Sequence, residues 1–110
     1  MPVRTKRLAR GNIGPANSPA TVYTCPPGET TIVKDVRVWL FGSVTARAQV
    51  FVTSGPASIR IVDVQLQPKS AVGAITWVVL GPGDTIHVQC DVADTLVFYV
   101  SGTELEGVAD

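Results

Sequence analysis

From residue 21 onward the chain is a series of short segments in which apolar and polar residues alternate. Segment 45–53 is typical, because Ala46, Ala48, Val50 and Val52 lie on one face and polar residues occupy most of the other. Alternation with a period of two predicts a strand with one buried face. Glycine and proline separate the segments, as expected of tight turns. The predicted strands cover residues 21–25, 30–41, 45–53, 58–67, 72–80, 85–92, 96–101 and 103–106.

Two of these segments depart from simple alternation. In 30–41 the even positions, from Ile32 to Leu40, form the better core face, but Lys34 interrupts it. In 58–67 the apolar phase changes, which predicts a β-bulge near Val62. About eight antiparallel strands without a convincing helix predict an all-β fold, a β-sandwich or jelly-roll over residues 21–110.

Residues 1–20 show neither the two-residue apolar period of a strand nor the 3.6-residue period of a helix, and they contain several glycines and prolines. This segment therefore predicts an extended N-terminal arm. The arm has four of the nine basic residues, and no acidic residue precedes Glu29. The remaining five basic and nine acidic residues give the body a net charge of −4. A solvated tail, docking on a protein subunit and contact with nucleic acid are the three alternatives. Docking is favoured, because the arm has apolar residues, lacks aromatic rings that would stack on bases, and precedes an acidic body. The predicted anchoring residues are Arg4, Lys6, Arg7, Leu8, Arg10 and Ile13.

The length of 110 residues is that of one ordinary domain. No apolar run reaches the roughly 18 residues of a membrane span, and no apolar signal-peptide segment follows the basic start. We therefore expect a protein that acts without export and has no membrane partner.

Candidate chemistry is sparse. His87 is the single histidine, and Asp91 lies roughly 13 Å further along the same strand face, too far for both to bind one ion. The serines lack a G-x-S-x-G turn, and the phosphate-binding and dinucleotide patterns are absent. Cys25 and Cys90 are interpreted as small buried residues, with a disulfide between them as the alternative. We predict no catalytic residue, no metal and no cofactor, and hence no enzyme.

Aromatic residues occur on strand faces opposite the predicted core. A second core layer would cover them; alternatively, they form the centre of a subunit interface, where aromatic residues and arginine are enriched. The predicted interface residues are Arg37, Trp39, Phe41, Ile75, Trp77 and Val79.

Three sequence motifs resemble small β-sandwich structural proteins of tailed bacteriophage virions. Residues 22–34 read V-Y-T-C-P-P-G-E-T-T-I-V-K, which is similar to the opening pattern Y-T-V-P-x-G-x-T-x-I-V-K of that group. Residues 80–86 (L-G-P-G-D-T-I) resemble its L-x-P-G-D-x-I turn, and residues 100–105 (V-S-G-T-E-L) resemble its V-S-G-x-E-L ending. Cys25 and Pro27 depart from the pattern. The resemblance implies a minor structural protein of a virion, often a symmetric oligomer, and implies no catalytic residues.

The leading hypothesis is a non-enzymatic bacteriophage virion protein that decorates the capsid or associates with the tail. It would form a homo-oligomer, with a trimer as one candidate, and bind capsid or tail subunits through its arm. Its location would be the virion, assembled in the host cytoplasm. The alternative is a carbohydrate- or receptor-binding module, because jelly-rolls commonly present aromatic side chains to sugars. A cupin-like enzyme with metal near His87 is a third hypothesis and depends on fold analogy alone.

Overall fold

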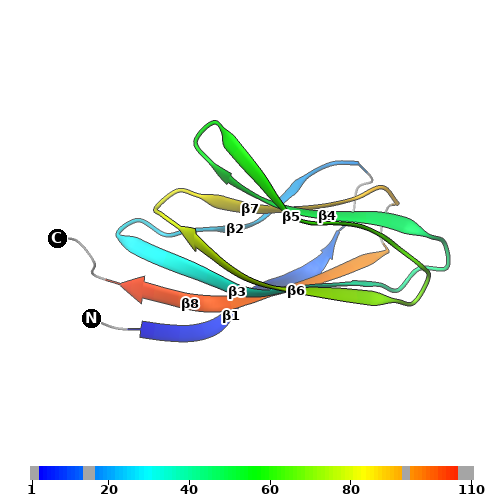
Figure 1. Cartoon of the computed structure of the whole chain (residues 1–110), viewed down its shortest axis with the longest axis horizontal. Coiled ribbons are helices and arrows are strands. Elements are labelled where there is room, and N and C mark those ends of the chain that lie inside the picture. The colour runs from blue at the N-terminus through cyan, green and yellow to red at the C-terminus, as the bar shows by residue number, and fades with distance from the viewer. Residues whose placement is uncertain (1–2, 14–16, 93–94, 107–110) are drawn as a thin grey trace.

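A computed structural model describes residues 3–13, 17–92 and 95–106. The fold is all-β and contains eight strands within these residues: β1 (Val3–Ile13), β2 (Ala20–Thr24), β3 (Glu29–Leu40), β4 (Ala46–Ser54), β5 (Ala57–Leu66), β6 (Ala71–Leu80), β7 (Thr85–Cys90) and β8 (Leu96–Glu106). The strands form two antiparallel sheets that face each other (Figure 1). The result is the predicted antiparallel sandwich.

The strand order makes the sandwich a jelly-roll. Sheet A has the order β1-β8-β3-β6, and sheet B has the order β2-β7-β4-β5. Neighbours within each sheet are mostly distant in sequence, because the chain crosses repeatedly from one sheet to the other. Edge strands are therefore β1 and β6 in sheet A and β2 and β5 in sheet B.

The N-terminal segment requires a correction. The expected separate arm is, over residues 3–13, strand β1 of the chain's own sheet A, where it pairs with β8. Residues 1–2 and 14–16 of that arm lie outside the described residues, as do the side chains of Arg4, Lys6, Arg7 and Ile13. Strand β1 is one of the four strands of sheet A, so residues 3–13 belong to the sandwich.

The C-terminal end differs in a smaller way. The two strands predicted over 96–101 and 103–106 are one continuous strand, β8, and Gly102 is buried within it. An added β-carbon at Gly102 would collide with the carbonyl oxygen of Ile32 on β3. Glycine at this position therefore allows close approach of the two backbones and does not break the strand.

The core lies between the sheets and consists mainly of valine and leucine side chains. The expected core face of β3 is right from Val36 to Leu40 but wrong at Ile32, since Val33 is the fully buried residue there. The β3–β8 pairing shifts register between Val33 and Asp35, so Lys34 marks a bulge that changes which face is buried. The bulge predicted near Val62 is confirmed by the register shift that leaves Ile61 unpaired between Arg60 and Val62.

A polar cluster joins the two sheets inside the sandwich. The Tyr23 hydroxyl of β2 donates a hydrogen bond of 2.6 Å to Oε2 of Glu104 on β8, which is 3% exposed. The same hydroxyl lies 2.8 Å from Oγ1 of Thr31 on β3. Burial, followed by the hydrogen bond to Glu104, raises the pKa of Tyr23 far above its ordinary value. The hydroxyl therefore keeps its proton and remains a donor to the buried carboxyl group.

Candidate functional site

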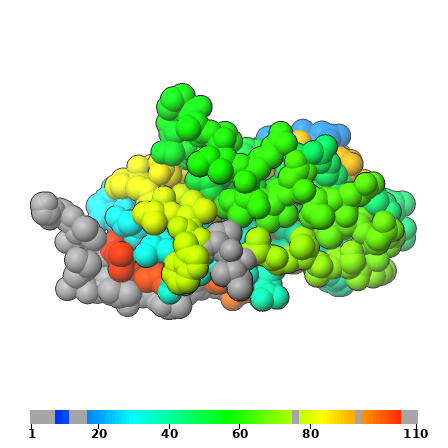
Figure 2. Space-filling model, viewed as in Figure 1, coloured from blue at the N-terminus to red at the C-terminus, as the bar shows by residue number. Residues whose placement is uncertain are grey.

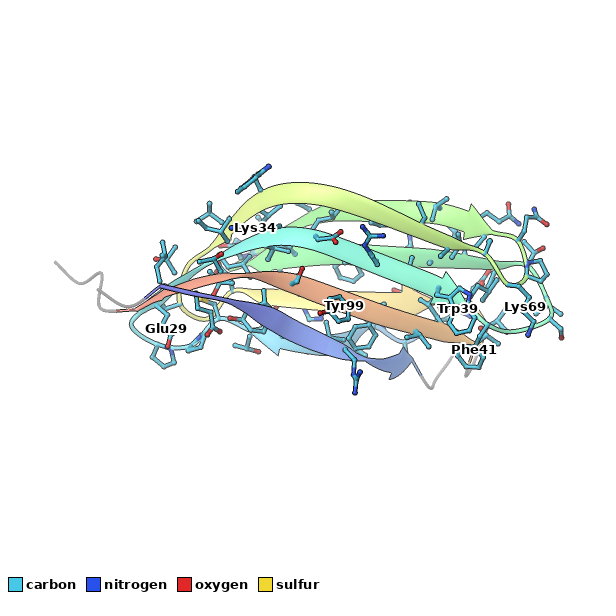
Figure 3. All side chains as sticks on the ribbon, turned by 90° about the horizontal axis from the view of Figure 1, so that it is seen from below. Glu29, Lys34, Trp39, Phe41, Lys69 and Tyr99 are labelled. Atoms are coloured by element: carbon cyan, nitrogen blue, oxygen red, sulfur yellow. The ribbon has the colours of Figure 1, made fainter. Side chains whose placement is uncertain are left out.

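The outer face of sheet A presents the exposed aromatic residues of the chain. Beyond the bulge, Asp35, Arg37 and Trp39 alternate with buried Val36 and Val38, so β3 directs them away from the core. The register places Tyr99 of β8 beside Arg37, and Arg10 of β1 beside Tyr99. In a view of this sheet, Tyr99 lies near its middle and Trp39 near one end (Figure 3).

An apolar hollow of about 190 Å³ opens at the Trp39 end of this face. Trp39 is 45% exposed and Tyr99 is 40% exposed, and both line the hollow together with the Arg37 side chain. Ala71, Val97 and neighbouring residues complete the wall. The Phe41 ring follows just beyond β3, with its centroid 5.8 Å from that of Trp39. This end of the sheet is a compact aromatic surface that is open to a partner.

A second apolar group lies at the opposite end of β6. Trp77 is 69% exposed and Val79 is 61% exposed. The Nζ atom of Lys34, the bulge residue, lies 5.5 Å from the centroid of the Trp77 ring, within the range of a cation–π contact. Trp39 pairs with Ala71, six residues before Trp77, so the two aromatic groups are roughly 20 Å apart along the sheet.

The described members of the predicted interface therefore form two groups on this side of sheet A. Arg37, Trp39 and Phe41 are together at one end, and Trp77 and Val79 are at the other. The side chain of Ile75 lies outside the described part of the structure. Sequence reasoning missed Tyr99 and Lys34. The alternation of Phe98, Tyr99 and Val100 would have placed Tyr99 outward, but only the register brings it beside Arg37.

The outer face of sheet B is more polar. Nε and an Nη atom of Arg47 donate to the two carboxylate oxygens of Asp63 at 2.7 and 2.8 Å, and Arg60 donates to Asp63 at 3.0 Å. These bonds, led by the hydrogen bond from Arg47, lower the pKa of Asp63 to about 2. Beyond this cluster, the tip of the β4–β5 hairpin stands out from the body and carries Ile59, which is 63% exposed (Figures 1 and 2).

His87 also lies on sheet B. Its ring stacks on Phe51 at a centroid separation of 5.3 Å. Nδ1 lies 3.1 Å from the Thr21 hydroxyl, and Nε2 lies 2.8 Å from the Thr85 hydroxyl. The described residues contain no group of three or more His, Cys, Asp or Glu side chains that could hold a metal ion. Both ring nitrogens of His87 thus have hydroxyl neighbours within the sheet.

The two cysteines are separate buried thiols. Cys25 and Cys90 are each 1% exposed, and both are free. The Cys25 thiol lies 3.3 Å from the Thr31 hydroxyl, at the margin of the polar cluster between the sheets. The interpretation as small buried residues is confirmed, and the disulfide alternative is not what the structure shows.

Comparison with solved structures shows that the fold is similar to part of a viral protein. A chain of infectious bursal disease virus, Gx strain, superposes with a TM-score of 0.54 at 8% identity, over 94% of this chain and 32% of the viral chain. At this identity the likeness concerns the fold alone. The chain spans about a third of the length of that viral protein.

Two looser overlaps carry no argument about function. A pentameric capsid protein from metagenomic phage sequences gives a TM-score of 0.40 at 17% identity, over 89% of this chain and 61% of that one. The catalytic domain of Agl-KA gives a TM-score of 0.45 at 20% identity, over 89% of this chain and 21% of that one. No family model and no curated protein matches the sequence. No helix long and apolar enough to cross a membrane occurs among the described residues.

Proposed function

We propose that this protein is a non-enzymatic structural subunit of a virus particle that assembles through the outer face of sheet A. The observation that carries the proposal is the exposure of Trp39, Tyr99, Trp77 and Val79 on one sheet face. Large apolar side chains gathered on the surface mark sites of association, and aromatic residues dominate the binding energy of many protein interfaces. The jelly-roll topology and the likeness to a viral chain support this function but do not specify it.

Within that function, the sequence motifs favour a tailed bacteriophage and a capsid-decorating or tail-associated position. The proposed location is the virion, assembled in the host cytoplasm, with capsid or tail subunits as partners. Attachment would use the N-terminal segment through the outer edge of β1, because that segment is a strand of sheet A and not a loose arm. An edge strand has backbone groups available for pairing with another chain. The exposed residue Arg10 adds positive charge beside that edge.

Light scattering of the purified full chain over a range of concentrations tests the association step. A homo-oligomer of defined mass is expected, with a trimer among the candidates, and Trp39→Ser should weaken it because the serine removes an aromatic anchor of the face. Val44→Ser is the matched control, because Val44 is also about half exposed, at 51%, but lies in the turn after β3. A wild-type protein that stays monomeric at high concentration would refute assembly through this face.

A carbohydrate-binding module is the second candidate, and the hollow beside Trp39 and Tyr99 is the observation that favours it. A sugar ring could stack on these aromatic side chains, with Arg37 as a hydrogen-bond donor. Apart from Arg37 and Tyr99, however, the residues lining the hollow have apolar side chains, whereas sugar recognition needs several placed polar groups. Calorimetric titration with neutral and acidic oligosaccharides decides between the two: saturable binding that Trp39→Ser abolishes would replace the structural function.

A further inference from the structure

Strand β6 is an edge of sheet A without charged residues or proline to oppose pairing. It runs for ten residues from Ala71 to Leu80 and contains neither a charged residue nor a proline. Its described pairing is with β3 alone, and Figure 3 shows it at the margin of the sheet with no strand beyond it. Figure 2 looks onto this side of the molecule, where the yellow-green residues of β6 lie at the surface. Long apolar edge strands are sites at which another strand adds.

The other three edges carry features that disfavour pairing with an uncharged strand such as β6. Strand β1 has four basic residues, and β5 has Arg60 and Asp63. Strand β2 has only five residues. Charges and short length are among the means by which natural sheets protect their edges. The bulges of β5 and β6 both lie in the pairing with the inner neighbour, at Ile61 of β5 and in β6 opposite Lys34, so they do not distinguish these two edges.

We propose that β6 pairs antiparallel with β6 of a second copy across a two-fold axis, so that the two A sheets become one continuous sheet. The inference rests on the proposed function for the association of copies, but it places the contact at the edge of sheet A and not on its outer face. Self-pairing is favoured because every residue of β6 meets an uncharged residue of the identical strand. By contrast, β1 of a second copy would place its four positive charges along a strand that has no carboxylate to receive them.

The contact would extend over the whole strand, because ten residues span roughly 33 Å at the usual strand rise. Two antiparallel ten-residue strands form up to about ten backbone hydrogen bonds, a typical number for an interface. The exposed side chains of Trp77 and Val79 would add apolar burial beside the backbone pairing.

A pair of matched substitutions tests the edge. Val79→Lys introduces an edge lysine at a residue that is 61% exposed, and Val44→Lys makes the same change in a turn at a residue that is 51% exposed. Because both sites are on the surface, both variants should fold, which circular dichroism verifies. Sedimentation velocity of the full chain should show a dimer dissociation constant at least about tenfold higher for Val79→Lys, since a charge then enters an apolar contact. Val44→Lys should match the wild type.

Cysteine cross-linking then tests the symmetry. In a full chain in which the buried Cys25 and Cys90 are replaced by serine, single cysteines are placed in turn along β6. Only a residue next to a two-fold axis meets its own copy within the distance of a disulfide. One position, or one adjacent pair, should therefore give a covalent dimer on mild oxidation. Failure at every position, or a Val79→Lys variant that dimerises like the wild type, would overturn the proposal.

The outcomes also separate this inference from the proposed function. If Trp39→Ser weakens association and Val79→Lys does not, the sheet face is the interface and pairing at β6 is wrong. Because Val79 also lies on the sheet face, its effect is interpreted together with the cross-link. If Val79→Lys separates the dimer, a cysteine in β6 gives the covalent dimer and Trp39→Ser has no effect, β6 pairing is retained and assembly through the Trp39 end of the face is refuted. Long filaments without a cross-linked dimer would indicate head-to-tail contact of different edges and would also refute two-fold pairing.

Discussion

Removal of one hydroxyl group, in Tyr23→Phe, should destabilise the fold out of proportion to its size. This hydroxyl connects the sheets, because it donates to Glu104 of sheet A at 2.6 Å while Tyr23 belongs to sheet B. The substitution leaves the ring in place and deprives a carboxyl group that is 3% exposed of a donor. Removing one partner from a buried polar group costs about 1–3 kcal/mol. We expect a loss of about 2 kcal/mol.

Thermal and urea unfolding measure this loss. For a domain of this size, 1 kcal/mol corresponds to a change in Tm of about 4 °C, so the Tyr23→Phe protein should melt about 8 °C below the wild type. Tyr99→Phe is the control, because it deletes the same hydroxyl from a residue that is 40% exposed on the outer face of sheet A. Its effect should stay within about 0.5 kcal/mol, as is usual for surface substitutions.

A double-mutant cycle with Glu104→Gln attributes the loss to the pair. The coupling between residues that share a hydrogen bond is typically about 0.5–3 kcal/mol, and the same range is expected between Tyr23 and Glu104. A Tyr23→Phe protein as stable as Tyr99→Phe, or a cycle with no coupling, would refute the conclusion that this bond stabilises the contact between the sheets.

Three further predictions concern separate parts of the molecule. Gly102→Ala should cost about 3 kcal/mol or prevent folding, because its β-carbon meets the Ile32 backbone, whereas Gly73→Ala meets only the flexible Arg37 side chain and should cost less than about 1 kcal/mol; urea unfolding compares them. Asp63 has a lowered pKa of about 2, so its contribution to stability is present above the ordinary value of 3.8 and is lost as pH falls through about 2. The difference in Tm between wild type and Asp63→Asn should therefore vanish toward pH 2, and a constant difference would contradict the ion pair. Cys25 and Cys90, each 1% exposed, should react with a thiol reagent only after unfolding in guanidinium, and fast reaction of the native protein would contradict their burial.

The strands with clean alternation could be predicted because each has one buried and one open face. In 85–92, Ile86, Val88 and Cys90 were expected on the core side, and all three are buried. The interruption at Lys34 and the phase change near Val62 both marked register shifts, although the pattern alone did not show that Val33 replaces Ile32 in the core. Local periodicity reports the face of a strand wherever the core covers one side evenly.

Strand β1 could not be predicted, for a reason that lies in another part of the chain. Its inward positions include Ala9 and Gly11, and a β-carbon at Gly11 would lie 3.4 Å from the Phe98 ring of β8. Leu8 packs against the core at the register shift between Arg7 and Ala9. Because the positions opposite Val100 and Phe98 are the small residues Ala9 and Gly11, they add no apolar alternation, and the segment was interpreted as an arm.

The candidate site, too, was predictable from the sequence only in part. Alternation alone put Arg37 and Trp39 on the face opposite the core, as the structure has them. Only the pairing of β3 with β8 brings Tyr99 beside Arg37, and only the strand order makes β6 an exposed edge. By itself, therefore, the sequence determined an all-β sandwich and most of its buried faces, because hydrophobic periodicity is a local property of each strand. The tertiary structure decided the place of β1, the division of the aromatic residues into two groups and the position of β6 at an edge, because these depend on pairing between strands that are distant in sequence.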